Sequence, residues 1–261
     1  MGSAPAGLVR RQITLAPGSP LRGLAGPGGE LWFVIAGTGR LDVGTLRGAA
    51  VGAGTLRGAV VGAGTLRGAV VGAGTLRGAA VGAGTGCRIP PGAEYRLRAE
   101  ENILLDAVAL PAPPPADATG AGTGGTAGTT TAEEPRLSEL AGCEVERTGD
   151  RRFRVLLGPG RGCEAATQFV GEIPPGRAPE HSHPYDEVVL VLDGEGVAHA
   201  GGSDLALVAG ASVHLPRGLP HCLENTGQRT LVVLGVFYPG GSPAAKTAGT
   251  AKTVGTLEAA R

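Results

Sequence analysis

The chain has 261 residues, enough for one large domain or two small ones with a substantial hydrophobic core. Its 23 Lys and Arg residues balance its 23 Asp and Glu residues, so no net charge attracts nucleic acid or an anionic membrane, and we expect neither partner. Aromatic residues make up only 3% of the chain and Gly is abundant, which favours strands and turns over long helices.

The sequence lacks the usual signals of secretion or membrane insertion. No apolar run follows the first charges, and no stretch reaches the roughly 18 uncharged apolar residues that a membrane helix needs. Four cysteines lie far apart without CxxC spacing, which indicates neither a zinc knuckle nor a disulfide framework: Cys87, Cys143, Cys163 and Cys222. We expect a soluble, cytoplasmic protein.

A decapeptide repeat fills much of the first half of the chain. Gly-Thr-Leu-Arg-Gly-Ala-(Ala/Val)-Val-Gly-Ala occurs four times, beginning at Gly44, Gly54, Gly64 and Gly74. Read in fives, it resembles pentapeptide-repeat proteins. That resemblance implies an inward stack of Leu46, Leu56, Leu66 and Leu76 and an exposed ladder of Arg47, Arg57, Arg67 and Arg77. The alternative, which we favour, is a repeat expansion without function in a tolerant surface loop of about 44–83.

Composition divides the chain into two halves. Residues 111–134, a proline cluster followed almost entirely by Ala, Gly and Thr, predict a flexible linker. Residues 242–261 predict a disordered tail. We therefore expect one domain at 1–110 and another at 135–241.

The second half consists of short β-rich runs separated by Gly, Pro and Asp-Gly turns. This pattern predicts an antiparallel barrel. The runs are 152–157, 166–170, 187–192, 203–208 and 230–237.

Three histidines and one carboxylate in this half have the spacing of a metal site. Alternate side chains of a strand share a face, so His181 and His183 point the same way and Glu187 keeps that parity. His221 completes a set of nitrogen and oxygen ligands that suits one divalent Fe, Mn, Ni, Cu or Zn ion and leaves coordination positions open.

These residues resemble the two motifs of the cupin superfamily. His181 through Glu187 to Gly194 fits the first motif, except that Gly176 stands one residue too close to His181, and Gly210 to Asn225 fits the second. The resemblance implies an all-β fold of antiparallel cupin barrels, of the double-stranded β-helix or jelly-roll type. It also implies that the four side chains hold the metal, whereas HxH alone is equally typical of ordinary strand histidines.

The first half repeats this pattern without most of the ligands. Glu30 and Gly37 have the spacing of Glu187 and Gly194, and the segment from Gly84 to Gly92 copies 210–218. Carrying the spacing across places Leu24, Gly26 and Tyr95 where His181, His183 and His221 stand. We therefore expect a bicupin whose first barrel binds no metal. Three extra repeat copies account for nearly all of the greater distance from Gly37 to Gly84.

Strand parity also predicts the wall of the metal pocket. Apolar side chains are expected from Val189, Val191, Leu223 and Phe237, and polar ones from Gln168 and Tyr185. No arginine or lysine falls on the predicted inward positions, which disfavours strongly anionic substrates such as sugar phosphates. His199 and His214 lie outside both motifs, and we expect them to be structural.

Three classes of function fit a metal-binding cupin with a small-molecule partner. The first, which we favour, is an oxygenase similar to quercetinase-like cupins, in which a small organic substrate chelates the metal. The second is a non-redox isomerase or amidohydrolase, which would need a further acid or base, since Glu187 is already a ligand. The third is a binding protein without turnover. The sequence assigns no catalytic residue and fits either a monomer or a homodimer.

Overall fold

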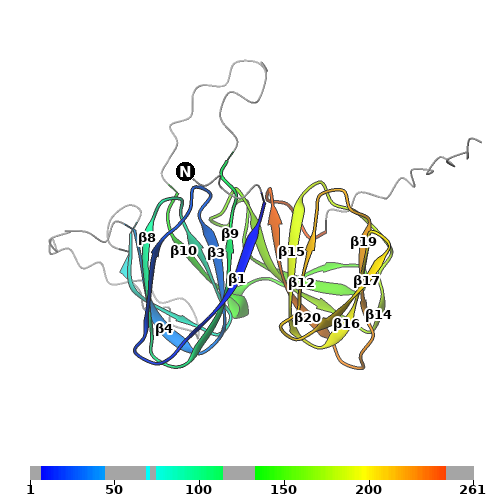
Figure 1. Cartoon of the computed structure of the whole chain (residues 1–261), viewed down its shortest axis with the longest axis horizontal. Coiled ribbons are helices and arrows are strands. Elements are labelled where there is room, and N and C mark those ends of the chain that lie inside the picture. The colour runs from blue at the N-terminus through cyan, green and yellow to red at the C-terminus, as the bar shows by residue number, and fades with distance from the viewer. Residues whose placement is uncertain (1–6, 45–68, 71–74, 114–132, 245–261) are drawn as a thin grey trace, which may run out of the picture.

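The computed structural model describes residues 7–44, 69–70, 75–113 and 133–244. Its regular structure is antiparallel β-strand apart from one short 3-10 helix, η2 (Leu140–Gly142). The strands form two barrels that lie side by side (Figure 1). The all-β class and the pair of antiparallel barrels expected from the sequence are confirmed.

The first barrel is built from two five-stranded sheets. Their strand orders are β1-β9-β3-β7-β10 and β2-β8-β4-β6-β5. The bounds are β1 (Val9–Leu15), β2 (Pro20–Leu24), β3 (Glu30–Ala36), β4 (Thr38–Gly44), β5 (Ala69–Val70), β6 (Leu76–Gly82), β7 (Thr85–Ile89), β8 (Glu94–Ala99), β9 (Ile103–Ala109) and β10 (Arg136–Glu139).

The second barrel combines a six-stranded and a four-stranded sheet. Their orders are β11-β12-β13-β20-β15-β18 and β14-β19-β16-β17. The bounds are β11 (Glu146–Thr148), β12 (Arg151–Leu157), β13 (Thr167–Ile173), β14 (Gly176–Arg177), β15 (Asp186–Asp193), β16 (Glu195–Ala200), β17 (Ser203–Val208), β18 (Ser212–Leu215), β19 (His221–Asn225) and β20 (Leu231–Tyr238).

Both barrels follow one pairing scheme. β3 pairs with β7 and β9, just as β15 pairs with β18 and β20. Glu30 lies opposite Ala109 on β9, and Glu187 lies opposite Phe237 on β20. The two glutamates therefore occupy equivalent positions, as the repeated sequence pattern predicts.

The same comparison aligns Tyr95 with His221. Tyr95 lies opposite Val43 on β4, and His221 lies opposite Ala200 at the same point of β16. The first barrel thus has a tyrosine where the second has its last histidine.

The predicted counterpart of His181 is wrong by one residue. His181 forms a bridge with His221, whereas the residue opposite Tyr95 is Gly23 and not Leu24. Leu24 points outward, with 65% of its surface exposed. The register differs because the segment leading to the shared glutamate is one residue longer in the first barrel. For the same reason the counterpart of the second histidine is the buried Ala25 rather than Gly26.

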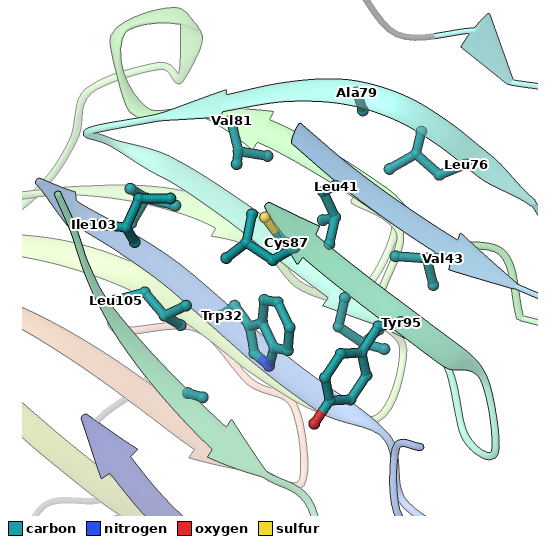
Figure 2. Close-up of a cluster of buried hydrophobic side chains, with 14 of the residues drawn as sticks. Trp32, Leu41, Val43, Leu76, Ala79, Val81, Cys87, Tyr95, Ile103 and Leu105 are labelled. Carbon is teal, nitrogen blue, oxygen red and sulfur yellow. The ribbon is translucent and has the colours of Figure 1, made fainter. Parts of the chain in front are cut away.

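Apolar side chains fill the first barrel. Trp32, Cys87 and Tyr95 lie next to one another in its interior (Figure 2). The rings of Trp32 and Tyr95 meet edge to face with centroids 4.8 Å apart. Ile103 and Leu105 continue this core. The described part of this interior is therefore packed with apolar side chains.

The fourth repeat copy supplies an ordinary barrel strand. Leu76 on β6 is buried in the core, whereas Arg77 beside it is half-buried on the opposite side of the strand. β6 pairs with β4, as a single copy in a barrel hairpin should. Leu46, Leu56, Leu66, Arg47, Arg57 and Arg67 lie outside the described residues.

The barrels contact each other through the outer faces of their larger sheets. Leu31 and Phe33 of β3 share one buried cluster with Leu156, Val170 and Leu234 of the second barrel. Alternation along each strand explains this contact, because neighbouring residues such as Trp32 point into the barrel instead. Burial of two apolar faces holds the barrels together.

β10 changes the expected boundary between the halves. The sequence divides them at residue 135, but β10 pairs antiparallel with β7 and extends the sheet of the first barrel. Because Glu139 lies opposite Thr85 in this pairing, the chain crosses to the second barrel only after η2. Most of the expected linker and tail, 114–132 and 245–261, lies outside the described residues.

A membrane helix can be sought only in the described part of the chain. There, no helix has the length and apolar character required to span a bilayer.

Candidate metal centre

Three histidines of the second barrel converge on one point. His181 and His183 precede β15, and His221 begins β19. One ring nitrogen from each lies within 4.8 Å of the others. An isolated backbone bridge between His181 and His221 holds these two segments side by side, with N to O distances of 2.9 and 2.8 Å.

Glu187 lies beside this cluster. Its Oε2 atom is 3.8 Å from Nε2 of His183 and 3.8 Å from Nε2 of His221. Donor atoms about 2.1 Å from a shared ion lie about 3.0 to 4.2 Å apart, so these separations fit a common metal. The 4.8 Å limit among the imidazoles requires a slight contraction. The donor set therefore fits one divalent ion held by three nitrogens and one oxygen.

Backbone carbonyls orient two of the imidazoles. Nδ1 of His181 lies 3.1 Å from the carbonyl oxygen of Pro179, and Nδ1 of His221 lies 2.8 Å from that of Leu219. A carbonyl only accepts, so each Nδ1 carries the proton and each Nε2 presents a lone pair. Such contacts fix the tautomer that a metal ligand requires. The sequence does not identify these partners.

Burial changes the protonation of the cluster. It raises the pKa of Glu187 to about 8 and lowers the pKa of His221 below its ordinary value. Both shifts favour the neutral group, because an apolar surrounding disfavours charge. The metal-free site therefore holds a neutral imidazole and a protonated carboxyl near pH 7.

Aromatic rings pack against the His183 imidazole. Its imidazole stacks on Tyr185 with centroids 4.7 Å apart and planes at 13°, and Tyr185 packs against Phe237. The Tyr185 hydroxyl donates to the carbonyl oxygen of Ser242, at 3.2 Å. Tyr185 does not line the cavity, so it does not make the polar substrate contact that the sequence predicts. Its ring packs against the His183 imidazole instead.

A cavity of ≈ 80 Å³ opens beside the histidines. Leu223 and Phe237 lie on its wall, as the sequence predicts. The remaining apolar wall comes from residues that strand parity did not single out: Phe153, Phe169, Ile173, Leu215 and Val233. Val189 and Val191 do point inward but belong to the packed core rather than to the wall.

Gln168 faces away from the cavity, contrary to the prediction. Its side-chain amide donates to the carbonyl oxygen of Trp32 in the first barrel, at 3.2 Å. The neighbouring Thr167 and Phe169 have the opposite parity, and Phe169 lines the cavity. Gln168 is therefore a contact between the barrels.

An arginine lines the cavity where the sequence predicts none. Arg151 begins β12 and shares its parity with the inward-facing Phe153. Its guanidinium donates to the carbonyl oxygen of Leu223, at 2.8 Å. The alternation of Arg151 with Phe153 and Val155 was the signal available in the sequence, because both apolar residues are buried inside the barrel.

In the first barrel, an ion pair occupies the place that corresponds to the histidine cluster of the second barrel. One guanidinium nitrogen of Arg11 lies 2.7 Å from Oε2 of Glu30 and 3.2 Å from the Tyr95 hydroxyl oxygen. The Trp32 indole donates to the same carboxylate oxygen, at 2.6 Å. Pairing on β1 and β9 places Arg11 where Phe169 stands in the second barrel. The Tyr95 ring also fills the space that a side chain at Gly23 would need.

The other two histidines lie outside the metal cluster. Nδ1 of His199 is 2.6 Å from Oδ1 of Asp204, and Nε2 is 2.9 Å from Oε2 of Glu224. These two carboxylates raise the pKa of His199, Glu224 contributing most. His214 is exposed on β18. Neither residue lines the cavity.

Comparison with known proteins agrees with the barrel fold. Residues 169–237 match the family model described as Cupin domain. The fold is similar to a variant of the Bacillus subtilis oxalate decarboxylase, with TM-score 0.64, 15% identity, and 93% of this chain and 71% of that chain covered. A cupin 2 conserved barrel domain protein from Leptotrichia buccalis aligns with TM-score 0.50 and 16% identity, over 91% of this chain and 92% of that chain.

The second barrel matches the cupin domain over residues 169–237, and the chain as a whole is similar in fold to solved structures of an oxalate decarboxylase and a cupin 2 barrel protein. Its second barrel combines the cupin domain match with a three-histidine cluster. No curated protein matches the sequence.

Proposed function

We propose that this protein is a metal-dependent cupin enzyme that oxidises a small organic metabolite with dioxygen, as a dioxygenase-type oxidoreductase. His181, His183, His221 and Glu187 would hold the metal. The observation that carries the proposal is the convergence of three imidazole nitrogens within 4.8 Å, beside a cavity of ≈ 80 Å³. A divalent Fe, Mn, Ni, Cu or Zn ion would supply Lewis acidity there, and the redox-active ones also electron transfer.

The protein's own side chains would position and shield the substrate. Phe169, Phe237 and Leu223 present apolar surface on the cavity wall, which excludes water from the reacting groups. The carbonyls of Pro179 and Leu219 keep two imidazoles in the ligating tautomer. A cavity of ≈ 80 Å³ suits a compact reacting group beside the metal.

The acid and base groups on the wall favour an oxygenase over a hydrolase or isomerase. Apart from the histidine cluster, the ionisable wall residues are Glu187, Glu172, Arg151 and Arg152. Glu187 belongs to the ligand set, and the Glu172 carboxylate pairs with Arg152 at 2.6 Å and with Arg154 at 2.7 Å. Within the described residues, no uncommitted carboxylate or imidazole is therefore left on the wall for general acid or base catalysis.

Oxygen consumption by the metal-loaded chain tests this proposal. The full-length protein, loaded in turn with each of the five metals, should consume dioxygen when a pool of small metabolites is added. His183→Ala should lose this activity together with the metal. Turnover that is unchanged under anaerobic conditions would replace the oxygenase with a non-redox enzyme, and metal binding without any turnover would indicate a binding protein.

A further inference from the structure

Arg151 is the one cationic group of the cavity wall whose charge is not balanced by a carboxylate among the described residues. Arg152, the other arginine on the wall, pairs with Glu172. For Arg151, no carboxylate oxygen within 4 Å is found in the described parts of the chain, and Asp150, which precedes it in the sequence, acts on its charge only from a greater distance. Its contact with the Leu223 carbonyl employs only one of the two terminal nitrogens.

The surroundings of Arg151 make an unbalanced charge costly. The side chain is half-buried, and its burial lowers the pKa of the guanidinium below its ordinary value. Phe153, Ile173 and Leu223 surround this part of the cavity and cannot hydrogen-bond to it through their side chains. A guanidinium has five N–H donors in a planar fork that matches a carboxylate. Among the described residues, the Leu223 carbonyl is the hydrogen-bond partner of this guanidinium, so its other N–H groups are available to a carboxylate that enters the cavity.

We propose that Arg151 binds a carboxylate of the substrate, while the opposite end of the same molecule reaches the histidine cluster. The inference rests on the proposed function, because it assumes that the metal centre and the cavity serve one ligand. The substrate class is then a small organic acid with a carboxylate at one end and a metal-coordinating oxygen at the other. The expectation against strongly anionic substrates rested on the absence of arginine and lysine from the wall, and Arg151 and Arg152 remove that reason.

The size of the cavity narrows the class further. A volume of ≈ 80 Å³ corresponds to the space of a few water molecules, so the part of the substrate held between Arg151 and the histidines fits an acid of few carbons. Arg151 and Phe153 stand on β12, and the histidines stand at β19 and before β15, so the two binding groups approach the cavity from different strands. The substrate must therefore span the cavity rather than bind at one point.

A chain-length series of dicarboxylates tests this assignment. Oxalate, malonate, succinate and glutarate are titrated into the full-length, manganese-loaded protein by calorimetry, and water proton relaxation reports whether each one displaces water from the metal. We expect one length to bind best and to lower the relaxation. The neutral diamide of that acid should bind at least tenfold more weakly, a comparison that needs no variant.

Substitutions then locate the carboxylate. Arg151→Met should weaken binding of the best dicarboxylate at least tenfold without changing metal content, and Arg151→Lys should recover part of the affinity. Arg154→Met is the matched control, because Arg154 lies on the same strand but does not line the cavity, and its charge is balanced by Glu172. It should bind as the unmodified chain does. Thermal unfolding verifies that each variant is folded.

Two outcomes overturn the assignment: equal affinity of Arg151→Met and the unmodified protein, or equal affinity for the diacid and its diamide. Failure of the proposed function is a separate result. If the unmodified protein binds no metal but still binds the dicarboxylate through Arg151, the carboxylate assignment stands and the metal-dependent enzyme does not.

Discussion

The Arg11 guanidinium lies 2.7 Å from Glu30 in the first barrel, where the second barrel has Glu187 beside three histidines. A side-chain cation thus neutralises the carboxylate that a metal ion would neutralise in the other half. Tyr95 accepts from the same guanidinium and replaces the last histidine. The two barrels share one topology but balance the buried glutamate in different ways.

Because of this difference, we expect removal of the two glutamates to affect different properties of the protein. Glu30→Ala should lower the free energy of unfolding by about 1–3 kcal/mol, because Arg11 and the Trp32 indole lose their acceptor. It should leave metal content unchanged. Glu187→Ala should instead weaken metal binding. Chemical denaturation and elemental analysis of both variants measure these effects, and metal loss in Glu30→Ala would show that the first barrel also binds an ion.

Metal binding should release a proton from Glu187. Its pKa of about 8 means that the carboxyl is protonated at pH 7 in the metal-free protein, and a metal binds only the ionised form. Below pH 8, affinity should rise about tenfold per pH unit, and the release should fade above pH 8. Calorimetry in two buffers of different ionisation enthalpy counts the protons. An identical heat in both buffers at pH 7 would contradict this protonation state.

His199 should make the stability of the folded chain depend on pH. Glu224 and Asp204 raise its pKa in the folded chain, so the folded state keeps the proton at a pH where the unfolded state has lost it. The stabilising contribution is therefore complete below the unfolded pKa of about 6.5 and disappears as pH rises through the folded value. His199→Gln and Glu224→Gln should each reduce this slope, measured by denaturation in the presence of a chelator. A slope unchanged in both variants would rule out this contribution.

Gly235 should be required for the shape of the cavity. A Cβ atom at this position would lie 2.2 Å from the ring of Phe169, which lines the wall. Gly235→Ala should therefore displace that ring and destabilise the chain by about 1–3 kcal/mol, without affecting metal content. Gly26→Ala is the control, since nothing lies within 4 Å of its added methyl. Equal stability of the two variants, measured by thermal unfolding, would show that the ring moves without cost.

Local sequence patterns were sufficient for the fold and for the cluster of histidines. Alternation places His181 and His183 on one face, and the topology brings His221 beside them. Long-range register was not predictable in the same way. One additional residue before Glu30 shifts the counterpart of His181 from Leu24 to Gly23, and nothing in the spacing alone reveals it.

The cavity wall was harder to predict because parity does not say which inward residues reach open space. Val189 points inward but is covered by core neighbours, whereas Val233 reaches the wall. Gln168 was assigned to the wrong face because its strand begins at Thr167, which fixes the alternation only once the pairing is known. Arg151 lies at the start of a strand, where periodicity is weakest.

The metal content of the full-length chain tests the central claim most directly. Elemental analysis of the unmodified protein and of His183→Ala should find about one divalent ion per chain in the first and almost none in the second. Equal metal in both proteins, or none in the unmodified chain after incubation with the five candidate ions, would contradict a metal centre in the second barrel.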